Sequence, residues 1–88
     1  MIESTIIIKN RTGLHARAAA KFVETTANYS SSIHVSNGEK SVDGKSILSV
    51  MMLAASPGSE LTLVIEGDDE SEALDAIEAL VKNNFGEE

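Results

Sequence analysis

Positions 13–19, Gly-Leu-His-Ala-Arg-Ala-Ala, combine a histidine, an arginine and an expected helix start. Alanine has the highest helix propensity, so we expect His15 to lie just before a helix, where the first N–H groups lack internal partners and the dipole adds about half a positive charge. Such a position binds anions, and an imidazole there can accept and return a phosphoryl group. We therefore expect His15 to carry the phosphoryl group and Arg17 to stabilise it by donating to its oxygens. The backbone N–H groups of Ala16, Arg17 and Ala18 would complete the phosphate site.

Both side chains also have ordinary structural explanations. A histidine in a loop is commonly a plain surface residue, and Arg17 could be a solvated helix residue. However, an arginine in the first helical turn opposes the dipole, a cost that a bound phosphoryl group would offset. The second histidine, His34, lies between Ile33 and Val35 with no arginine or helix start beside it, so strand alternation predicts that it faces solvent. The combination of neighbours therefore favours His15 as the site.

Length and composition limit the classes of function. A chain of 88 residues is expected to form a single domain, residues 1–88, with one small core, so its chemistry should lie on an exposed edge. Because the chain has no cysteine, it can form neither disulfides nor thiolate metal sites, which suits the cytoplasm. The N-terminus does not resemble a signal peptide, and no apolar stretch is long enough to enter a membrane. We expect no metal site and no cofactor, because the acids at 68–72 lack the ligand spacing of a calcium loop.

Charge is distributed unevenly along the chain, whose net charge is −7. Residues 1–22 contain four basic side chains and one acid, whereas residues 58–88 contain ten acids and a single lysine. Nucleic acid is excluded as a partner, since the chain offers no broad basic face and few aromatic rings for base stacking. The basic rim near His15 suits one small anion or the acidic surface of a protein.

The periodicity of apolar residues predicts seven elements. They are strands at 5–9, 32–36, 39–43 and 61–66 and helices at 16–27, 46–54 and from 69 onward. Asn37 and Gly38 predict a two-residue type I′ hairpin turn. In the first helix, the predicted buried face consists of Ala16, Ala19, Ala20, Val23 and Ala27.

Two predicted helices carry a polar residue suited to their N-terminus. Ser46 is the expected N-cap of the second helix, and Asp69 with Glu72 predicts a capping box for the third. The third helix should end at Asn83 and Asn84. The element order β-α-β-β-α-β-α predicts an α+β open-faced sandwich, with a four-stranded antiparallel sheet and three helices on one face.

The second predicted helix has two candidate roles. Phosphorylation of Ser46 would add close to two negative charges at a helix start and could regulate binding, although capping alone explains a serine there. Gly44, Lys45 and Ser46 do not form a nucleotide-binding loop, because that loop needs glycine at the position of Glu39. Leu48, Met51 and Met52 are either plain core or, on so short and apolar a helix, partly exposed as a docking patch beside His15. Thr12 and Lys21 are the other expected docking residues.

The motif at 13–17, the segment Gly44-Lys45-Ser46-Ile47, and the length and element order together resemble HPr, the histidine-containing phosphocarrier family of the bacterial phosphoenolpyruvate-dependent phosphotransferase system. The resemblance covers the whole chain. It implies that His15 receives a phosphoryl group on Nδ1 from phosphorylated enzyme I and passes it to a histidine of an enzyme IIA component. It also implies that Arg17 lies beside the phosphoryl group and that Ser46 is the target of an HPr kinase/phosphorylase in those bacteria that have one.

Some alternatives stay open at the level of sequence. The family usually has proline after the motif arginine, where this chain has Ala18, so the entry to the helix is expected to be less rigid. A sugar-linked protein and a nitrogen-linked paralogue with a mainly regulatory role share the histidine motif. A third alternative is a regulatory interaction module without phosphotransfer. We expect a cytoplasmic, monomeric carrier that is not itself an enzyme.

Overall fold

The computed structural model describes residues 1–53 and 55–86, and the predicted element order is confirmed. Its elements are β1 (Ile2–Ile7), α1 (Ala16–Thr26), β2 (Ser32–Ser36), β3 (Ser41–Asp43), α2 (Ile47–Met51), β4 (Glu60–Glu66), α3 (Glu70–Lys82) and a 3-10 turn (Asn84–Gly86). In the part of the chain described, no helix is long and apolar enough to cross a membrane.

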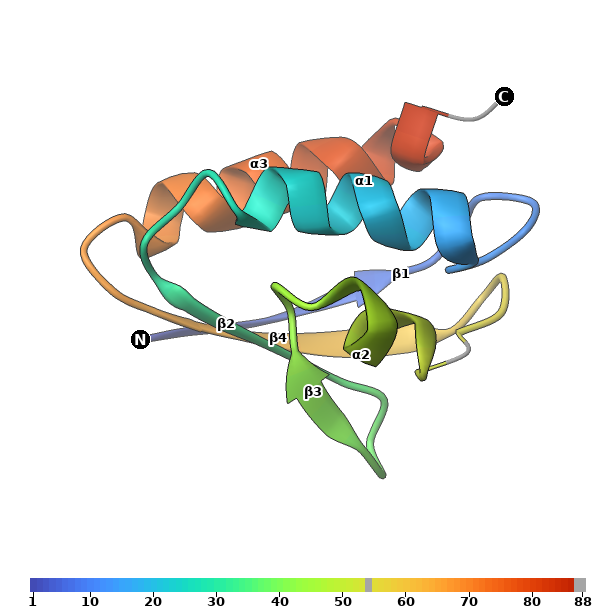
Figure 1. The fold of residues 1–88 in the computed structure, drawn as a ribbon, viewed down its shortest axis with the longest axis horizontal. Coiled ribbons are helices and arrows are strands. Elements are labelled where there is room, and N and C mark those ends of the chain that lie inside the picture. The colour runs from blue at the N-terminus through green and yellow to red at the C-terminus, as the bar shows by residue number, and fades with distance from the viewer. Residues whose placement is uncertain (54, 87–88) are drawn as a thin grey trace.

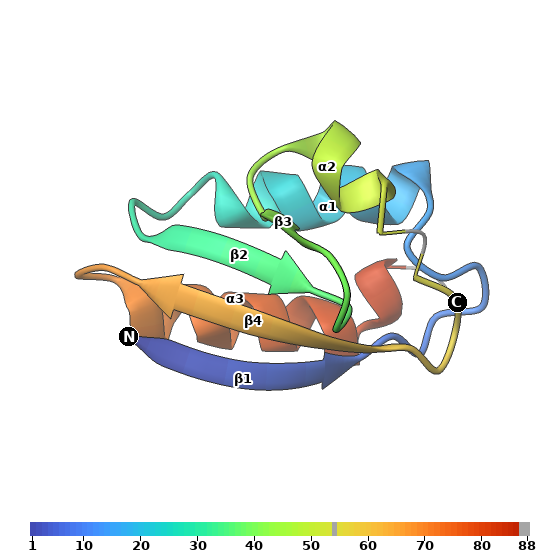
Figure 2. The same cartoon turned by 90° about the horizontal axis from the view of Figure 1, so that it is seen from below.

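The four strands form one antiparallel sheet in the order β1-β4-β2-β3. The long helices α1 and α3 lie side by side over one face, and α2 lies beside α1 toward the β3 edge (Figures 1 and 2). The predicted α+β sandwich is therefore confirmed. The start of α1, which carries His15, lies at one end of the helical layer, beside the loop that precedes β4 (Figure 1).

Strand alternation buries the residues expected from the sequence. Ile6 and Ile8 are buried while Ile7 is 47% exposed, and His34 is exposed between two buried neighbours, as predicted. The first strand runs from residue 2 to 7 rather than from 5 to 9, because β1 pairs along its whole length with β4, starting at Ile2 opposite Ile65. The backbone hydrogen bonds to β4 extend β1 to residues whose side chains show no clear strand pattern.

The predicted buried face of α1 is confirmed at Ala19, and Val23 packs partly buried against the core, but the rest of the face differs from the prediction. The helix buries Ala18, Ala19, Phe22 and Thr26, whereas Ala16 and Ala27 are exposed. Phe22 has by far the largest apolar side chain of the helix, so its burial sets the rotation, and alanines can lie on either face at little cost.

The turn between β2 and β3 is also longer than predicted. The strands pair from Ser36 opposite Ser41, which leaves a four-residue loop, so the third strand begins at 41 rather than 39. Gly38 has a positive φ of 97° but Asn37 does not, which excludes a type I′ turn. Instead, the Asn37 side-chain oxygen accepts hydrogen bonds from the N–H groups of Glu39 and Lys40, at 3.0 and 2.9 Å. Because the asparagine side chain closes the loop in this way, Asn37 itself does not need a positive φ.

The second helix has the predicted cap but is shorter than predicted. Ser46 is its N-cap and accepts a hydrogen bond from Ser49 N–H at 3.4 Å. The helix ends at Met51, because the N–H of Leu53 donates to Val50, three residues back, and so tightens the last turn. The predicted end at residue 54 lies outside the described residues.

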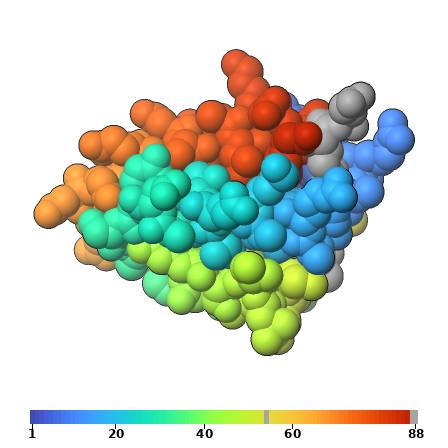
Figure 3. Space-filling view, turned by 45° about the horizontal axis from the view of Figure 1, so that its top comes forward, coloured from blue at the N-terminus to red at the C-terminus, as the bar shows by residue number. Residues whose placement is uncertain are grey.

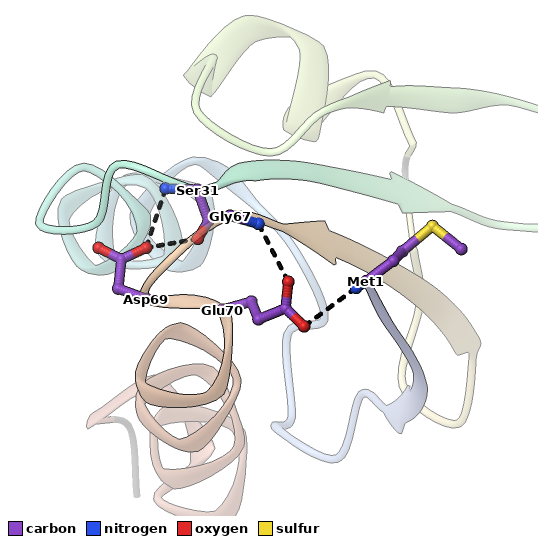
Figure 4. Close-up of polar contacts among 5 residues, drawn as sticks. All are labelled: Met1, Ser31, Gly67, Asp69 and Glu70. Atoms are coloured by element: carbon purple, nitrogen blue, oxygen red, sulfur yellow. Dashed lines mark hydrogen bonds and ion pairs between the residues drawn. The ribbon is translucent and has the colours of Figure 1, made fainter.

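The predicted capping box of α3 was wrong. Asp69 occupies the N-cap but makes no side-chain bond to its own helix. Its carboxylate instead accepts from Ser30 N–H at 2.8 Å. It also accepts from Ser31 N–H at 3.0 Å and from the Ser31 hydroxyl (Figure 4). Glu70, rather than Glu72, reaches back to Gly67 N–H at 3.0 Å and also pairs with the Met1 amino group. At its other end the helix stops at Asn83, as predicted.

Candidate functional site

The loop that precedes α1 is held by backbone bonds to the loop that precedes β4. Leu14 N–H donates to Ala55 C=O at 2.8 Å, and Gly58 N–H donates to Ile8 C=O at 2.7 Å. Within the loop, the Asn10 side-chain amide donates to Gly13 C=O at 2.7 Å. Leu14 is buried in the core, so the residue after it is presented from an anchored backbone.

Gly13 is required by this anchoring. Its φ of +72° lies in the left-handed region, and a Cβ at this position would approach Ala55 O to 2.6 Å. No other residue type allows the two loops to come this close. The glycine of the motif therefore positions the histidine two residues later.

His15 is the N-cap residue of α1. Its φ and ψ of −88° and −173° are extended, and its Nδ1 accepts a hydrogen bond from Arg17 N–H at 3.3 Å. The ring is partly exposed, so Nδ1 lies both at the helix N-terminus and within reach of solvent. The sequence predicted a histidine at the helix start, but it did not predict that the imidazole itself would be the cap. The preference of N-caps for serine, threonine and aspartate hides this role.

The first turn of α1 supplies the other predicted phosphate-binding groups. The first backbone bond of the helix runs from Ala19 N–H to His15 C=O at 2.8 Å, so the N–H groups of Ala16, Arg17 and Ala18 precede it. The Arg17 side chain is exposed, and no ion pair holds it among the residues that the structure describes. Ala18 is fully buried, so its methyl group packs into the core.

A surface cavity of about 410 Å³ opens beside His15. Thr12 and Ala16 line it on one side, and Met51 of α2 lines it on the other, together with residues 55–57. Of the predicted docking residues, the structure therefore brings Thr12 and Met51 to the site. Lys21 does not line the cavity; it lies one turn beyond Arg17, with its ammonium group near Gly86.

Four apolar side chains of α2 and its C-cap residue are exposed, and we call them the α2 patch. They are Ile47 (44% exposed), Leu48 (70%), Met51 (37%) and Met52 (58%). The core receives Val50 and Leu53 from this segment instead, so the interpretation of the predicted residues as plain core was wrong. Figure 3 shows α2 packed beside the first half of α1 on one surface of the molecule. Ile47 was missed, although its spacing of four residues from Met51 places both on one helix face.

The segment that carries Ser46 is tied to the far end of α1. The buried Thr26 hydroxyl donates to Gly44 C=O at 2.8 Å, and Lys45 Nζ donates to Tyr29 C=O at 2.6 Å. Ser46 is partly exposed at the start of α2. Thr26 and Lys45 were missed, because a buried threonine within a helix and an isolated lysine leave no pattern in a sequence.

Comparisons with known proteins agree with this arrangement. The family model described as the PTS HPr component phosphorylation site matches residues 2–83. The phosphocarrier protein HPr of Pseudomonas aeruginosa is 53% identical over 87 residues, covering 98% of this chain and 94% of the relative. The crystal structure of HPr-C-His from Thermoanaerobacter tengcongensis is 51% identical and superimposes with a TM-score of 0.95, covering 100% of this chain and 99% of that one. An HPr dimer structure from the same organism is 50% identical, with a TM-score of 0.79 and coverage of 99% and 100%.

The fold and the histidine at the helix start define a small phosphocarrier built on an open-faced sandwich. The extent and identity of these matches then settle the family. The chain belongs to the HPr family of the phosphotransferase system.

Proposed function

We propose that His15 accepts a phosphoryl group on Nδ1 from phosphorylated enzyme I and donates it to a histidine of an enzyme IIA component. One observation carries the proposal: Nδ1 lies at the first turn of α1, where it accepts a hydrogen bond from Arg17 N–H, and the residue is partly exposed. An anion bound at this nitrogen meets both the helix dipole and the N–H donors.

The transfer needs only a small rearrangement. The Nδ1 lone pair forms the new N–P bond while the bond between phosphorus and the donor histidine breaks, and the donor ring leaves with that electron pair. The Arg17 N–H that now donates to Nδ1 is then released to donate to a phosphoryl oxygen, and the exposed guanidinium of Arg17 adds a second donor. Donation to the next protein is the same step reversed, with His15 as leaving group.

The surroundings of His15 suit a carrier rather than an enzyme. The cavity is open to solvent and is shared between Thr12, Met51 and residues 55–57, so a partner protein supplies the rest of the reaction site. The α2 patch gives that partner an apolar contact, and the cations near the start of α1 give it a charged one. We propose transient complexes of small interface area, formed in the cytoplasm by one domain, residues 1–88.

Ser46 is proposed as a regulatory site. Its side chain caps α2 directly beside the α2 patch, so a phosphoryl group there would place close to two negative charges next to the docking surface. The helix start tolerates that charge, so binding would change without loss of the fold. The modifying enzyme would be a kinase of the HPr kinase/phosphorylase type. Capping alone is the alternative role of this serine.

The test is phosphorylation by enzyme I and phosphoenolpyruvate. We expect one acid-labile phosphoryl group on the wild-type protein, none on His15→Ala, and a normal amount on His34→Ala, the matched histidine variant on an exposed strand position. Circular dichroism should show that both variants are folded. Labelling of Ser46 alone, or no labelling at all, would contradict the proposal and support a regulatory interaction module without phosphotransfer. Phosphoryl transfer from the labelled protein to a sugar-branch and to a nitrogen-branch enzyme IIA component, measured side by side, would show which of the two branches the protein serves.

A further inference from the structure

The methionines of this chain are concentrated where the proposed partners dock. Of three methionines in the sequence, two are Met51 and Met52, which form half of the α2 patch. They are 37% and 58% exposed, so solvent and small oxidants reach both thioethers. The chain has no cysteine, which leaves methionine sulfur as its most readily oxidised group.

Met51 is also part of the site itself. It lines the same cavity as His15, so a change in its polarity alters the surface that a partner must cover when it reaches the imidazole. The third methionine, Met1, is 75% exposed but lies at the start of β1, at the opposite end of the molecule from the start of α1 (Figure 1). It therefore serves as an internal reference for oxidation without an effect on docking.

We propose that Met51 and Met52 are oxidative modification sites whose conversion to the sulfoxide weakens partner docking and so slows phosphoryl transfer through His15. The proposal rests on the proposed carrier function. A peroxide transfers one oxygen atom to the thioether sulfur, whose lone pair forms the S–O bond while the O–O bond breaks, and the peroxide leaves as water or an alcohol. Sulfur is oxidised by two electrons and the peroxide is reduced by two. A thiol-dependent sulfoxide reductase can reverse the change.

The structure indicates that oxidation acts on docking rather than on folding. The core contribution of the segment comes from Val50 and Leu53, and the two methionines lie at its surface. A sulfoxide is polar and well hydrated. When an apolar partner surface covers it, it loses its hydrogen bonds to water and gains none in return, so the binding free energy becomes less favourable. The imidazole and the N–H groups of the first turn of α1 are chemically unchanged.

The experiment oxidises the full chain with hydrogen peroxide and locates sulfoxides by peptide mass spectrometry. The KM and kcat for phosphorylation by enzyme I are then measured for oxidised and untreated samples. The double variant Met51→Leu/Met52→Leu, which keeps Met1, is treated in parallel and compared only with its own untreated sample. We expect oxidation to raise the wild-type KM by roughly fivefold or more, the factor that corresponds to burying an unpaired polar group, with little change in kcat. We expect the KM of the double variant to be the same before and after oxidation. Treatment with sulfoxide reductase should restore the KM of the oxidised wild type.

Two results would overturn the inference. One is a wild-type protein with both sulfoxides present and an unchanged KM. The other is a double variant whose KM rises on oxidation by the same factor as that of the wild type, which would mean that oxidation acts at another residue. Failure of the untreated protein to accept a phosphoryl group is a different outcome, because it would overturn the proposed function and this inference together.

Discussion

At the scale of single residues, the proposed function gives His15 two roles that are usually separate. A helix N-cap is normally a short polar side chain that only satisfies backbone donors, whereas here the capping atom is a nucleophilic nitrogen. In the proposed transfer, the N–H group that orients the ring beforehand would be available to the phosphoryl oxygens afterwards. In this arrangement a backbone N–H group of the helix orients the imidazole.

Removal of the Arg17 guanidinium should slow transfer without unfolding the protein, since this side chain is exposed. We expect Arg17→Ala to lower kcat/KM for phosphorylation by enzyme I by roughly ten- to a hundredfold, because a charge-assisted hydrogen bond contributes about 1.5–3 kcal/mol. Arg17→Lys should recover part of the loss. Lys40→Ala, which removes an exposed cation from the β2–β3 loop, is the control for net charge. Equal losses in Arg17→Ala and Lys40→Ala would mean that only overall charge matters.

Gly13 and Gly38 form a matched pair for testing the loop geometry. Both have positive φ, but a Cβ at Gly13 would meet Ala55 O at 2.6 Å, whereas a Cβ at Gly38 would meet nothing within 4 Å. Gly38→Ala should therefore cost only the backbone strain, about 1 kcal/mol, while Gly13→Ala should cost about 1–3 kcal/mol more and displace the His15 loop. Urea unfolding measures the free energies. Equal costs for the two variants would show that the contact with Ala55 does not constrain the loop.

At the scale of elements, Asp69 ties the start of α3 to the connection between α1 and β2 (Figure 4). The hydrogen bond from the Ser31 hydroxyl, followed by that from Ser30 N–H, lowers the pKa of Asp69 from 3.8 to about 2. The bond from Gly67 N–H, followed by the interaction with the Met1 amino group, also lowers the pKa of Glu70. Two neighbouring carboxylates thus hold three parts of the chain together at the end of the molecule opposite His15.

The lowered pKa of Asp69 predicts a pH dependence of stability. A carboxyl group whose pKa is lower in the folded protein stabilises the fold above its unfolded pKa, so this contribution is present above about pH 4 and disappears as the pH falls toward 2. We expect Asp69→Asn to be less stable than the wild type at neutral pH, with the difference shrinking over that window. Thermal unfolding between pH 2 and 7 provides the measurement, with Asp68→Asn, an exposed neighbour, as the control. A difference that stays constant down to pH 2 would contradict the assignment.

Some elements follow from the sequence because their signal is strong and local. The strands alternate with period two and contain large β-branched residues, so the inward positions at Ile6, Ile33 and Ile65 could be predicted. The face of α1 could not, since an alanine-rich helix has a weak pattern and Phe22 decides its rotation through contacts made by the whole fold. The Asp69 contact joins residues about 40 positions apart, and no local rule for helix caps contains it.

The candidate site was partly predictable for the same reason. The residues at positions 13–19 are contiguous, so their shared geometry at the helix start could be predicted from spacing alone. The cavity that joins His15 to Met51 depends on how α2 packs beside α1, and the exposure of Ile47 depends on the early end of α2. Both are consequences of tertiary packing.

At the scale of the whole molecule, the helical layer places the proposed docking features together. The start of α1 and the α2 patch share one surface, while the acidic first turn of α3 lies at the other end of the layer (Figures 1 and 3). Such a separation of charge orients an approaching acidic partner toward the His15 end. The opposite face of the sheet, which carries His34, has no part in this account.

We predict that the protein is a monomer under the conditions of phosphotransfer, because an accessible α2 patch and an accessible His15 are both needed for partner binding. Light scattering coupled to gel filtration measures the mass directly. The measurement distinguishes two real alternatives, because a similar HPr from Thermoanaerobacter tengcongensis has been solved as a dimer. A stable dimer that covers the α2 patch and still transfers phosphate at the same rate would contradict the docking role of that patch.

In the proposed function, the phosphoryl group resides on one nitrogen at the start of α1. Phosphorus and nitrogen NMR of the chain phosphorylated by enzyme I, with ¹⁵N-labelled histidine, identifies the modified atom. We expect a single phosphohistidine at His15 Nδ1, accompanied by shifts of the amide signals of Ala16, Arg17 and Ala18. Phosphate on His15 Nε2, on His34 or on Ser46 alone, or an unchanged set of amide signals, would contradict it.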